Sequence, residues 1–161
     1  MQVKNYKEFL NEVYAEDITK SSTPKRKERS KRVKVTFEKA SRNSKIAYFK
    51  AKDPKGSGKQ YQTSVQLEEH SGLSKDLSQQ ERVKLALEAG DVKIFCNCPD
   101  FLYGGYKYIA YQMDFGIRKE NIRPNKKNPN LEGTGCKHII ATVENIQKFV
   151  PQIAKGFSYK K

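Results

Sequence analysis

Hydrophobic side chains at the start of the chain recur at helical spacing. They lie three, four or seven residues apart, which places them on one face of a helix. The pattern predicts a short amphipathic helix within residues 1–19. The residues that share this face are Val3, Tyr6, Leu10, Val13 and Tyr14.

From residue 33 onward, apolar and polar positions alternate, as they do along β-strands. The alternating runs lie at residues 33–37, 46–50, 61–67 and 92–96, and a polar turn at residues 41–44 separates the first two. Such a turn between two alternating runs favours a hairpin. Together the runs predict a small, mostly antiparallel sheet.

Two segments after the third run carry helix signals. Ser78 followed by Glu81 is a capping box at the start of a helix of about three turns. Asp100 is the expected N-cap of an aromatic-rich helix that extends to residue 116, with a weak point at residues 104–105.

The last apolar face runs from Ile139 to Val150, and Pro151 is expected to end that helix. Strands and helices that occupy separate stretches of the chain indicate an α+β fold, with a small antiparallel sheet and flanking helices. The predicted divisions are an N-terminal helix at 1–19, a basic arm or linker at 20–34 and an α+β body at 33–161.

Composition limits the class of protein. The chain has 161 residues, of which 36% are hydrophobic and 31% are charged, and eight Phe and nine Tyr are enough to build a modest core. No stretch approaches the roughly 18–20 apolar residues of a membrane span, and the N-terminus lacks the apolar run of a signal peptide. We therefore expect no membrane partner and a location inside a cell or a particle.

Positive charge is concentrated in one segment. The formal net charge is +14, and residues 20–34 hold eight cationic side chains and one acidic one. Like charges at this density repel, which predicts an exposed arm. The arm can bind DNA or RNA phosphates, which its charge density favours, or it can be a solvated linker that faces an acidic subunit. The candidate nucleic-acid-binding residues are Lys25, Arg26, Lys27, Arg29, Lys31 and Arg32.

All three cysteines and one of the two histidines fall into two short motifs. Cys96-Asn97-Cys98 and Cys136-Lys137-His138 are separated by 37 residues. Three thiolates and one imidazole form a closed tetrahedral donor set for Zn²⁺. The first motif ends a predicted strand and the second opens a predicted helix, where free backbone N–H groups can bind sulfur. A Cys96–Cys98 disulfide would be strained and would leave Cys136 over, so the pattern favours one structural zinc ion.

No set of residues indicates catalysis. A catalytic zinc keeps one position open for water, and a closed set of four ligands leaves none. His70 is expected in a surface loop. Residues 55–59 lack the spacing of a phosphate-binding loop and precede a strand, which favours a hairpin turn. We therefore expect a protein that is not an enzyme and has no small-molecule substrate.

Aromatic residues follow the first cysteine motif at helical spacing. Exposed rings there could stack on bases, but the spacing favours packing or a protein interface. The residues concerned are Phe101, Tyr103, Tyr106, Tyr108, Tyr111 and Phe115.

The C-x-C…C-x-H pattern resembles the SWIM-type zinc finger, a small β-β-α zinc-binding module. The resemblance covers about residues 92–150, and its 37-residue separation is longer than SWIM modules usually have. It implies four zinc ligands by position. These are Cys96, Cys98, Cys136 and His138.

The residues around the two motifs are also similar to those of SWIM-like proteins of tailed bacteriophages. The similarity lies in Cys98-Pro99-Asp100-Phe101, in Asn128-Pro129 and in Gly135 before the second motif. Such proteins are mostly virion or assembly proteins. The resemblance implies a zinc-stabilised virion protein that binds other subunits and possible contact with packaged DNA. The alternative is a nucleic-acid-binding regulator in the host cytoplasm.

Overall fold

The alternating runs form a sheet of four antiparallel strands in the order β1-β2-β3-β4. The structure, a computed structural model, describes residues 18, 24–55, 58–68, 70–120 and 135–158. The α+β class and the antiparallel sheet predicted from the sequence are confirmed. The strands are β1 (Lys34–Ser41), β2 (Ile46–Lys52), β3 (Gln60–Leu67) and β4 (Val92–Cys96).

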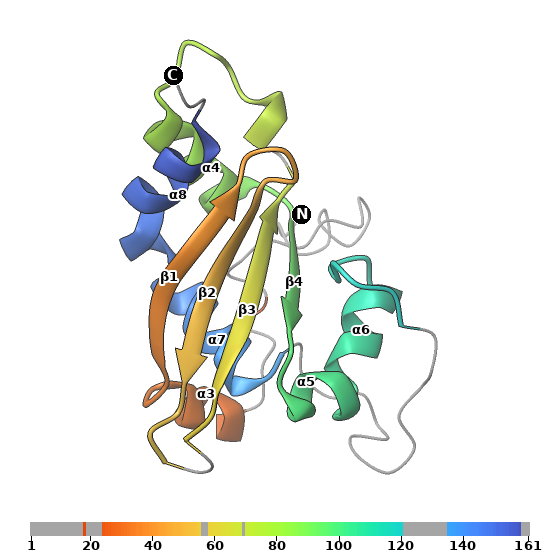
Figure 1. The fold of residues 1–161 in the computed structure, drawn as a ribbon. Coiled ribbons are helices and arrows are strands. Elements are labelled where there is room, and N and C mark those ends of the chain that lie inside the picture. The colour runs from red at the N-terminus through yellow and green to blue at the C-terminus, as the bar shows by residue number, and fades with distance from the viewer. Residues whose placement is uncertain (1–17, 19–23, 56–57, 69, 121–134, 159–161) are drawn as a thin grey trace.

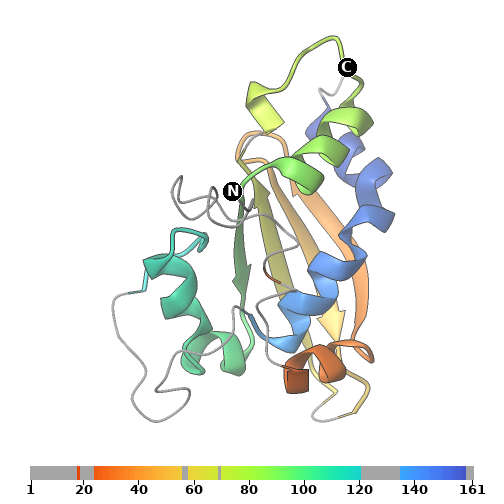
Figure 2. The same ribbon diagram turned by 180° about the vertical axis from the view of Figure 1, so that it is seen from behind.

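Helices pack on one face of this sheet. Figure 1 shows the strands in front of α4, α7 and α8, and Figure 2 shows the same helices in front of the strands. No helix in the described part of the chain covers the other face of the sheet. The helices are α3 (Pro24–Ser30), α4 (Gln79–Ala89), α5 (Pro99–Tyr103), α6 (Tyr106–Gln112), α7 (Lys137–Asn145) and α8 (Val150–Phe157), with short 3-10 helices at His70–Gly72 and Ile146–Phe149.

The covered face of the sheet forms the core. Ala47, Phe49 and Ala51 of β2 are fully buried. The strand register places Val65 beside Ala47 and Ile94 beside Val65, so a buried row crosses three strands. Each large apolar side chain buried in this way contributes about 1.5–3 kcal/mol. The row therefore fixes β4, the strand that ends in the first cysteine motif.

The predicted N-cap at Ser78 is confirmed. Its Oγ accepts a hydrogen bond from the Glu81 N–H at 3.1 Å, and α4 follows for eleven residues. The amphipathic helix predicted within residues 1–19 lies outside the described residues except for Ile18, which is buried in the core.

His70 is buried, although its polar neighbours predict a surface loop. Its Nε2 lies 2.9 Å from Oε1 of Gln79, and its ring meets the Phe157 ring edge-on at a centroid distance of 5.0 Å. Burial lowers the pKa of His70. The residue therefore joins the start of α4 to the end of α8, a contact between segments far apart in the sequence.

The aromatic-rich segment after residue 98 forms two helices, whereas the sequence predicts one. The N-cap of α5 is Cys98, and the predicted N-cap Asp100 lies inside the first turn. Gly104 ends α5, where a Cβ would collide with the carbonyl oxygen of Asp100, and Gly105 has a φ of 94°. That left-handed backbone turns the chain between α5 and α6.

The chain after α6 returns to β4. The Ile94 N–H donates to the Phe115 carbonyl at 2.7 Å, and the Ile117 N–H donates to the Ile94 carbonyl at 3.0 Å. Residues 115–117 therefore pair with the backbone N–H and carbonyl of Ile94 at the outer edge of β4, groups that would otherwise be unpaired.

Pro151 begins a helix, whereas the sequence predicts that it ends one. α7 ends at Asn145, a 3-10 turn follows, and Pro151 lies in the first turn of α8. A first-turn N–H has no partner within the helix, so the loss of that N–H in proline costs nothing there.

The sequence predicts an exposed basic arm or linker at residues 20–34. Where the structure describes this stretch, most of its side chains are exposed, but residues 24–30 form the helix α3. α3 lies against α7, and Ser30 and Val33 are buried, so this part of the stretch is folded onto the body.

Two acidic partners explain why the cationic segment folds. Nη2 of Arg26 lies 3.2 Å from Oδ1 of Asp100, and Nε of Arg32 lies 2.9 Å from Oδ1 of Asp53. These carboxylates offset the repulsion among like charges. Both acids lie far from α3 in sequence, so a local charge pattern cannot reveal them.

Among the helices that the structure describes, none has the length and apolar character that crossing a membrane requires.

Candidate metal centre

The two cysteine motifs meet at one end of the sheet. Cys96 is the last residue of β4 and pairs in register with Thr63 of β3. Cys98 is the N-cap of α5 and Cys136 is the N-cap of α7. His138 lies in the first turn of α7. The structure therefore brings together the four residues that the sequence predicts as zinc ligands.

The geometry of the four donors fits one metal ion. Their ligand atoms all lie within 4.8 Å of one another, and all four residues are buried. In a tetrahedral site with Zn–S bonds of about 2.3 Å, neighbouring sulfur atoms are about 3.8 Å apart. The donor set, three sulfurs and one imidazole, is that of a closed structural zinc site.

Hydrogen bonds to sulfur favour the thiolate form of one cysteine. Hydrogen bonds from the thiols of Cys136 and Cys96 hold the pKa of Cys98 far below its usual range. The Phe101 N–H also donates to Sγ of Cys98 at 3.4 Å. Burial raises the pKa of Cys96 and of Cys136. A dication at the centre would supply the charge that lets all three thiols ionise.

His138 is held in place from two sides. Its ring lies 5.1 Å from the Tyr61 ring, centroid to centroid, and its carbonyl accepts a hydrogen bond from Oγ1 of Thr142 at 2.8 Å. Thr142 also hydrogen-bonds to Oγ1 of Thr63 at 2.7 Å, which ties α7 to β3. Within the described residues, the buried Nδ1 of His138 has no hydrogen-bond partner. An imidazole that lies with three sulfurs and keeps a buried ring nitrogen without a protein partner in the described chain fits a metal-bound histidine.

The buried carboxylate of Asp53 holds the second cysteine motif in place, although it is not one of the four donors. Asp53 follows β2 and contacts Nζ of Lys137 at 2.6 Å, Nε of Arg32 at 2.9 Å and the Lys55 N–H at 2.9 Å. Its side chain is 5% exposed. Hydrogen bonds from Arg32 and Lys137 overcome the effect of burial and hold the pKa of Asp53 well below its usual range. Because Lys137 lies between two ligands, Asp53 fixes the ligand-bearing turn to the end of β2.

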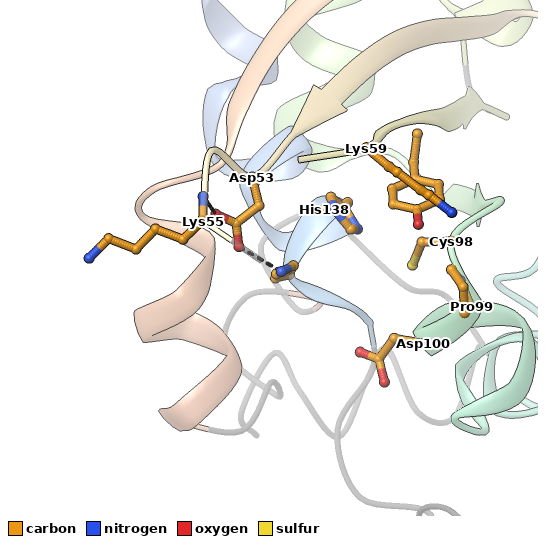
Figure 3. Close-up of a pocket in the computed structure, with 9 residues that line it drawn as sticks. Asp53, Lys55, Lys59, Cys98, Pro99, Asp100 and His138 are labelled. Atoms are coloured by element: carbon orange, nitrogen blue, oxygen red, sulfur yellow. Dashed lines mark hydrogen bonds and ion pairs between the residues drawn. The ribbon is translucent and has the colours of Figure 1, made fainter. Parts of the chain in front are cut away.

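A small cavity adjoins the centre. Its volume is 170 Å³, and its lining includes Cys98, His138, Lys55 and Lys59, with Lys59 on the side of Cys98 and Lys55 on the side of Asp53 (Figure 3). The two candidate ligands in its lining, Cys98 and His138, are 2% and 4% exposed.

The six candidate nucleic-acid-binding residues do not form one free cationic surface. Arg26 makes two hydrogen bonds to Asp100, and its guanidinium lies 4.8 Å from the centroid of the Tyr106 ring. Arg32 is held by Asp53, as described above. Lys25, Arg29, Lys31 and Arg32 are exposed, although Lys31 contacts Glu28 at 3.2 Å and Arg32 contacts Asp53. Lys27 is partly buried.

Sequence patterns did not reveal the residues that surround the ligands. From the sequence alone, Asp53 is expected to be a loop residue after a strand, and Tyr61 is expected to be one of several apolar positions on the next strand. A buried carboxylate held by two cations is recognised only when the ends of β2 and α7 are brought together.

The comparison with family models finds the SWIM zinc finger at residues 81–108. This stretch contains Cys96 and Cys98, and the structure places Cys136 and His138 beside them to complete the donor set. The chain carries a SWIM-type zinc finger. No curated protein and no solved structure matches the chain. In this SWIM finger the ligand pairs are joined by a long insertion that includes α5 and α6.

Proposed function

We propose that this SWIM-zinc-finger protein is a non-enzymatic, zinc-stabilised component of a larger protein assembly. The observation that carries the proposal is the closure of the metal centre. Four buried donors saturate a tetrahedral ion, so no position is left for water or a substrate. Zinc bound there would supply folding energy by joining the end of β4 to the start of α7.

The α5–α6 insertion supports a role in assembly. Phe101 and Tyr106 are buried against the body, whereas Tyr103 is 70% exposed and Met113 is 56% exposed. The two helices stand beside β4, away from α4 and α8 (Figure 1). Exposed aromatic and Met side chains on a fixed helical element are typical anchors of protein interfaces. The resemblance to SWIM-like phage proteins favours a tailed-phage particle as the assembly.

Isolation of the native material tests this proposal. We expect the chain to sediment with a large particle and to co-purify with other subunits. We also expect Tyr103→Ala with Met113→Ala to be lost from the particle, because the exposed anchors are removed. Leu85→Ala, which truncates an exposed residue of α4 (40% exposed), is the matched control and should stay incorporated. A monomer that never enters particles would contradict the proposal.

A second candidate function is nucleic-acid binding. The observation that favours it is the net charge of +14, together with the outward-pointing Lys25, Arg29 and Lys31 near α3. Neutralisation of these three residues should weaken binding to DNA or RNA and reduce its dependence on salt. Binding that is absent, or that does not respond to salt, would exclude this candidate.

A further inference from the structure

The face of the sheet that no described helix covers, called here the uncovered face, carries an ordered row of side chains. The register pairs Lys39 of β1 with Tyr48 of β2, Tyr48 with Ser64 of β3, and Ser64 with Phe95 of β4. Residues paired in register point to the same face, and this face is opposite the helices (Figure 1). From β1 to β4, the row therefore consists of a cation, an aromatic ring, a hydroxyl group and a second aromatic ring.

A second cation completes this row. Arg118, which follows the segment that pairs with β4, has its Cζ 5.4 Å from the centroid of the Phe95 ring. Nζ of Lys39 lies 5.1 Å from the centroid of the Tyr48 ring. Lys39 lies on β1, and Arg118 follows residues 115–117 at the outer edge of β4, so each cation lies beside one ring of the pair. In register, the small Ser64 of β3 lies between the strands that carry the two rings. We call these five residues the aromatic row.

A cavity opens on this face over Ser64. Its volume is 280 Å³, close to the lower end of the roughly 300–1,000 Å³ of small-molecule sites. Ser64 and Ile46, 4% and 8% exposed, line it together with both rings of the aromatic row. Gln62 and Arg118 add polar groups to its lining. Aromatic rings in the lining of a cavity are surfaces on which a planar ring can stack.

Cations continue from the cavity along the same face of the sheet. Arg118 is the charged residue of the cavity lining, and Glu38 nearby is engaged by Nε2 of Gln62 at 2.6 Å. Lys50 and Lys52 follow Tyr48 at alternate positions of β2, and both are exposed. Lys34 lies directly opposite Lys52 in register. Like charges in direct cross-strand pairs destabilise a sheet, so this pairing favours a ligand that supplies negative charge. Phosphate groups spaced like alternate residues of a strand would lie beside Lys50 and Lys52.

We propose that the uncovered sheet face binds single-stranded nucleic acid, with one base between Tyr48 and Phe95 and adjacent phosphates on the lysines of β1 and β2. Base stacking on aromatic side chains, next to cations that follow the backbone, is the general basis of single-strand binding. The proposal rests on the second candidate function and moves the main contact from α3 to the sheet. Duplexes, whose bases are already stacked, would bind more weakly.

The test measures the affinity of the zinc-loaded full chain for dye-labelled oligothymidylate and oligouridylate of about ten nucleotides, a length within the site size of one small domain. We expect both to bind more tightly than a duplex of the same length. Tyr48→Ala should weaken binding at least about tenfold because it removes a stacking wall. Tyr48→Phe keeps the ring and should bind like wild type.

Two controls separate stacking from charge and from misfolding. Leu85→Ala removes an exposed apolar side chain of α4, on the other side of the sheet, and should leave the affinity unchanged. Zinc content and far-UV circular dichroism check the folding of each variant. Unlabelled polyglutamate should compete poorly, because it offers charge without bases. Competition by polyglutamate equal to that by the oligonucleotide would overturn the proposal and indicate an acidic protein partner.

The remaining outcomes separate this proposal from the second candidate function. If Tyr48→Ala binds as well as wild type and the Lys25, Arg29 and Lys31 variant does not, nucleic acid is bound through α3 and the sheet-face proposal is wrong. If no oligonucleotide or duplex binds at all, both the sheet-face proposal and the second candidate function are wrong.

Discussion

Cys98 and Cys136 each begin a helix as well as contributing to the metal centre. Sγ of Cys98 accepts the Phe101 N–H, in the place where serine, threonine or aspartate usually caps a helix. Cys136 stands at the same position of α7. A thiolate carries negative charge, which the N-terminus of a helix stabilises. At Cys98, capping and metal binding therefore favour the same ionised form, whereas the Cys136 side chain makes no cap hydrogen bond.

Replacement of one ligand should abolish both metal binding and folding. In small zinc fingers the metal contributes an apparent binding free energy of about 10–16 kcal/mol. We expect Cys136→Ser to lose the one zinc ion per chain and to lack a cooperative unfolding transition. Metal analysis and circular dichroism measure the two effects. Val143→Ala in the same helix should be less stable than wild type but should still hold one zinc ion; a folded, zinc-free Cys136→Ser would contradict the prediction.

Asp53 should make stability depend on pH. Its folded-state pKa is depressed by Arg32 and Lys137, so its contribution is complete above the unfolded pKa of about 4 and is lost as the pH falls below that value. We expect Asp53→Asn to be about 1–3 kcal/mol less stable at neutral pH. Urea titrations over a pH series, with zinc held constant, should show the difference from wild type shrinking in acid.

A matched carboxylate separates this effect from general charge. Asp114→Asn removes an acid that is 62% exposed and pairs with Lys93 at 3.6 Å, and its effect should be below about 1 kcal/mol at every pH. An Asp53→Asn deficit that stays constant down to pH 3 would show that the charge of Asp53 does not stabilise the fold.

At the scale of elements, the corner between α5 and α6 depends on two adjacent glycines. A side chain at Gly104 would strike the carbonyl of Asp100, and Gly105 uses a left-handed φ. We expect Gly104→Ala to cost about 1–3 kcal/mol. Gly72→Ala, where a Cβ would meet nothing within 4 Å, should change stability by less than about 0.5 kcal/mol. Thermal unfolding of the two variants gives the comparison, and equal stabilities would contradict this account.

Elements with local signals were predictable from the sequence, and elements set by distant contacts were not. The alternating strands and the Ser78 cap depend on neighbouring residues, and both predictions were right. Pro151 was misread because proline suits the start of a helix as well as the residue after one. α3 was missed because its carboxylate partners, Asp53 and Asp100, are supplied by other parts of the chain.

The cluster of four candidate ligands was predictable because rare residues in short motifs limit the possibilities. Cysteine and histidine are scarce in this chain, and the spacing of each pair places both of its donors on one turn. The support around them was not predictable. Asp53 and Lys137 are 84 residues apart, and no local pattern joins a carboxylate after one strand to a lysine at the start of a helix.

At the scale of the molecule, the metal centre joins the sheet to the helical layer. β4 ends at Cys96 and α7 begins after Cys136, so removal of zinc would leave a buried group of thiols between two layers of the fold. We expect a strong chelator to cause cooperative loss of circular dichroism and added zinc to restore it. An unchanged spectrum after complete metal removal would contradict a structural role for the ion.

The position of the insertion has a consequence for the length of the chain. Its two ends, Cys98 and Cys136, both contribute donor atoms to a cluster that is 4.8 Å across at most. Once zinc joins these two ends, a change in the number of residues between them costs little, since each doubling of a flexible loop adds only about 0.6 kcal/mol. Added sequence should leave the ligand geometry intact where it spares α5, α6 and residues 115–117, which pack on or pair with β4.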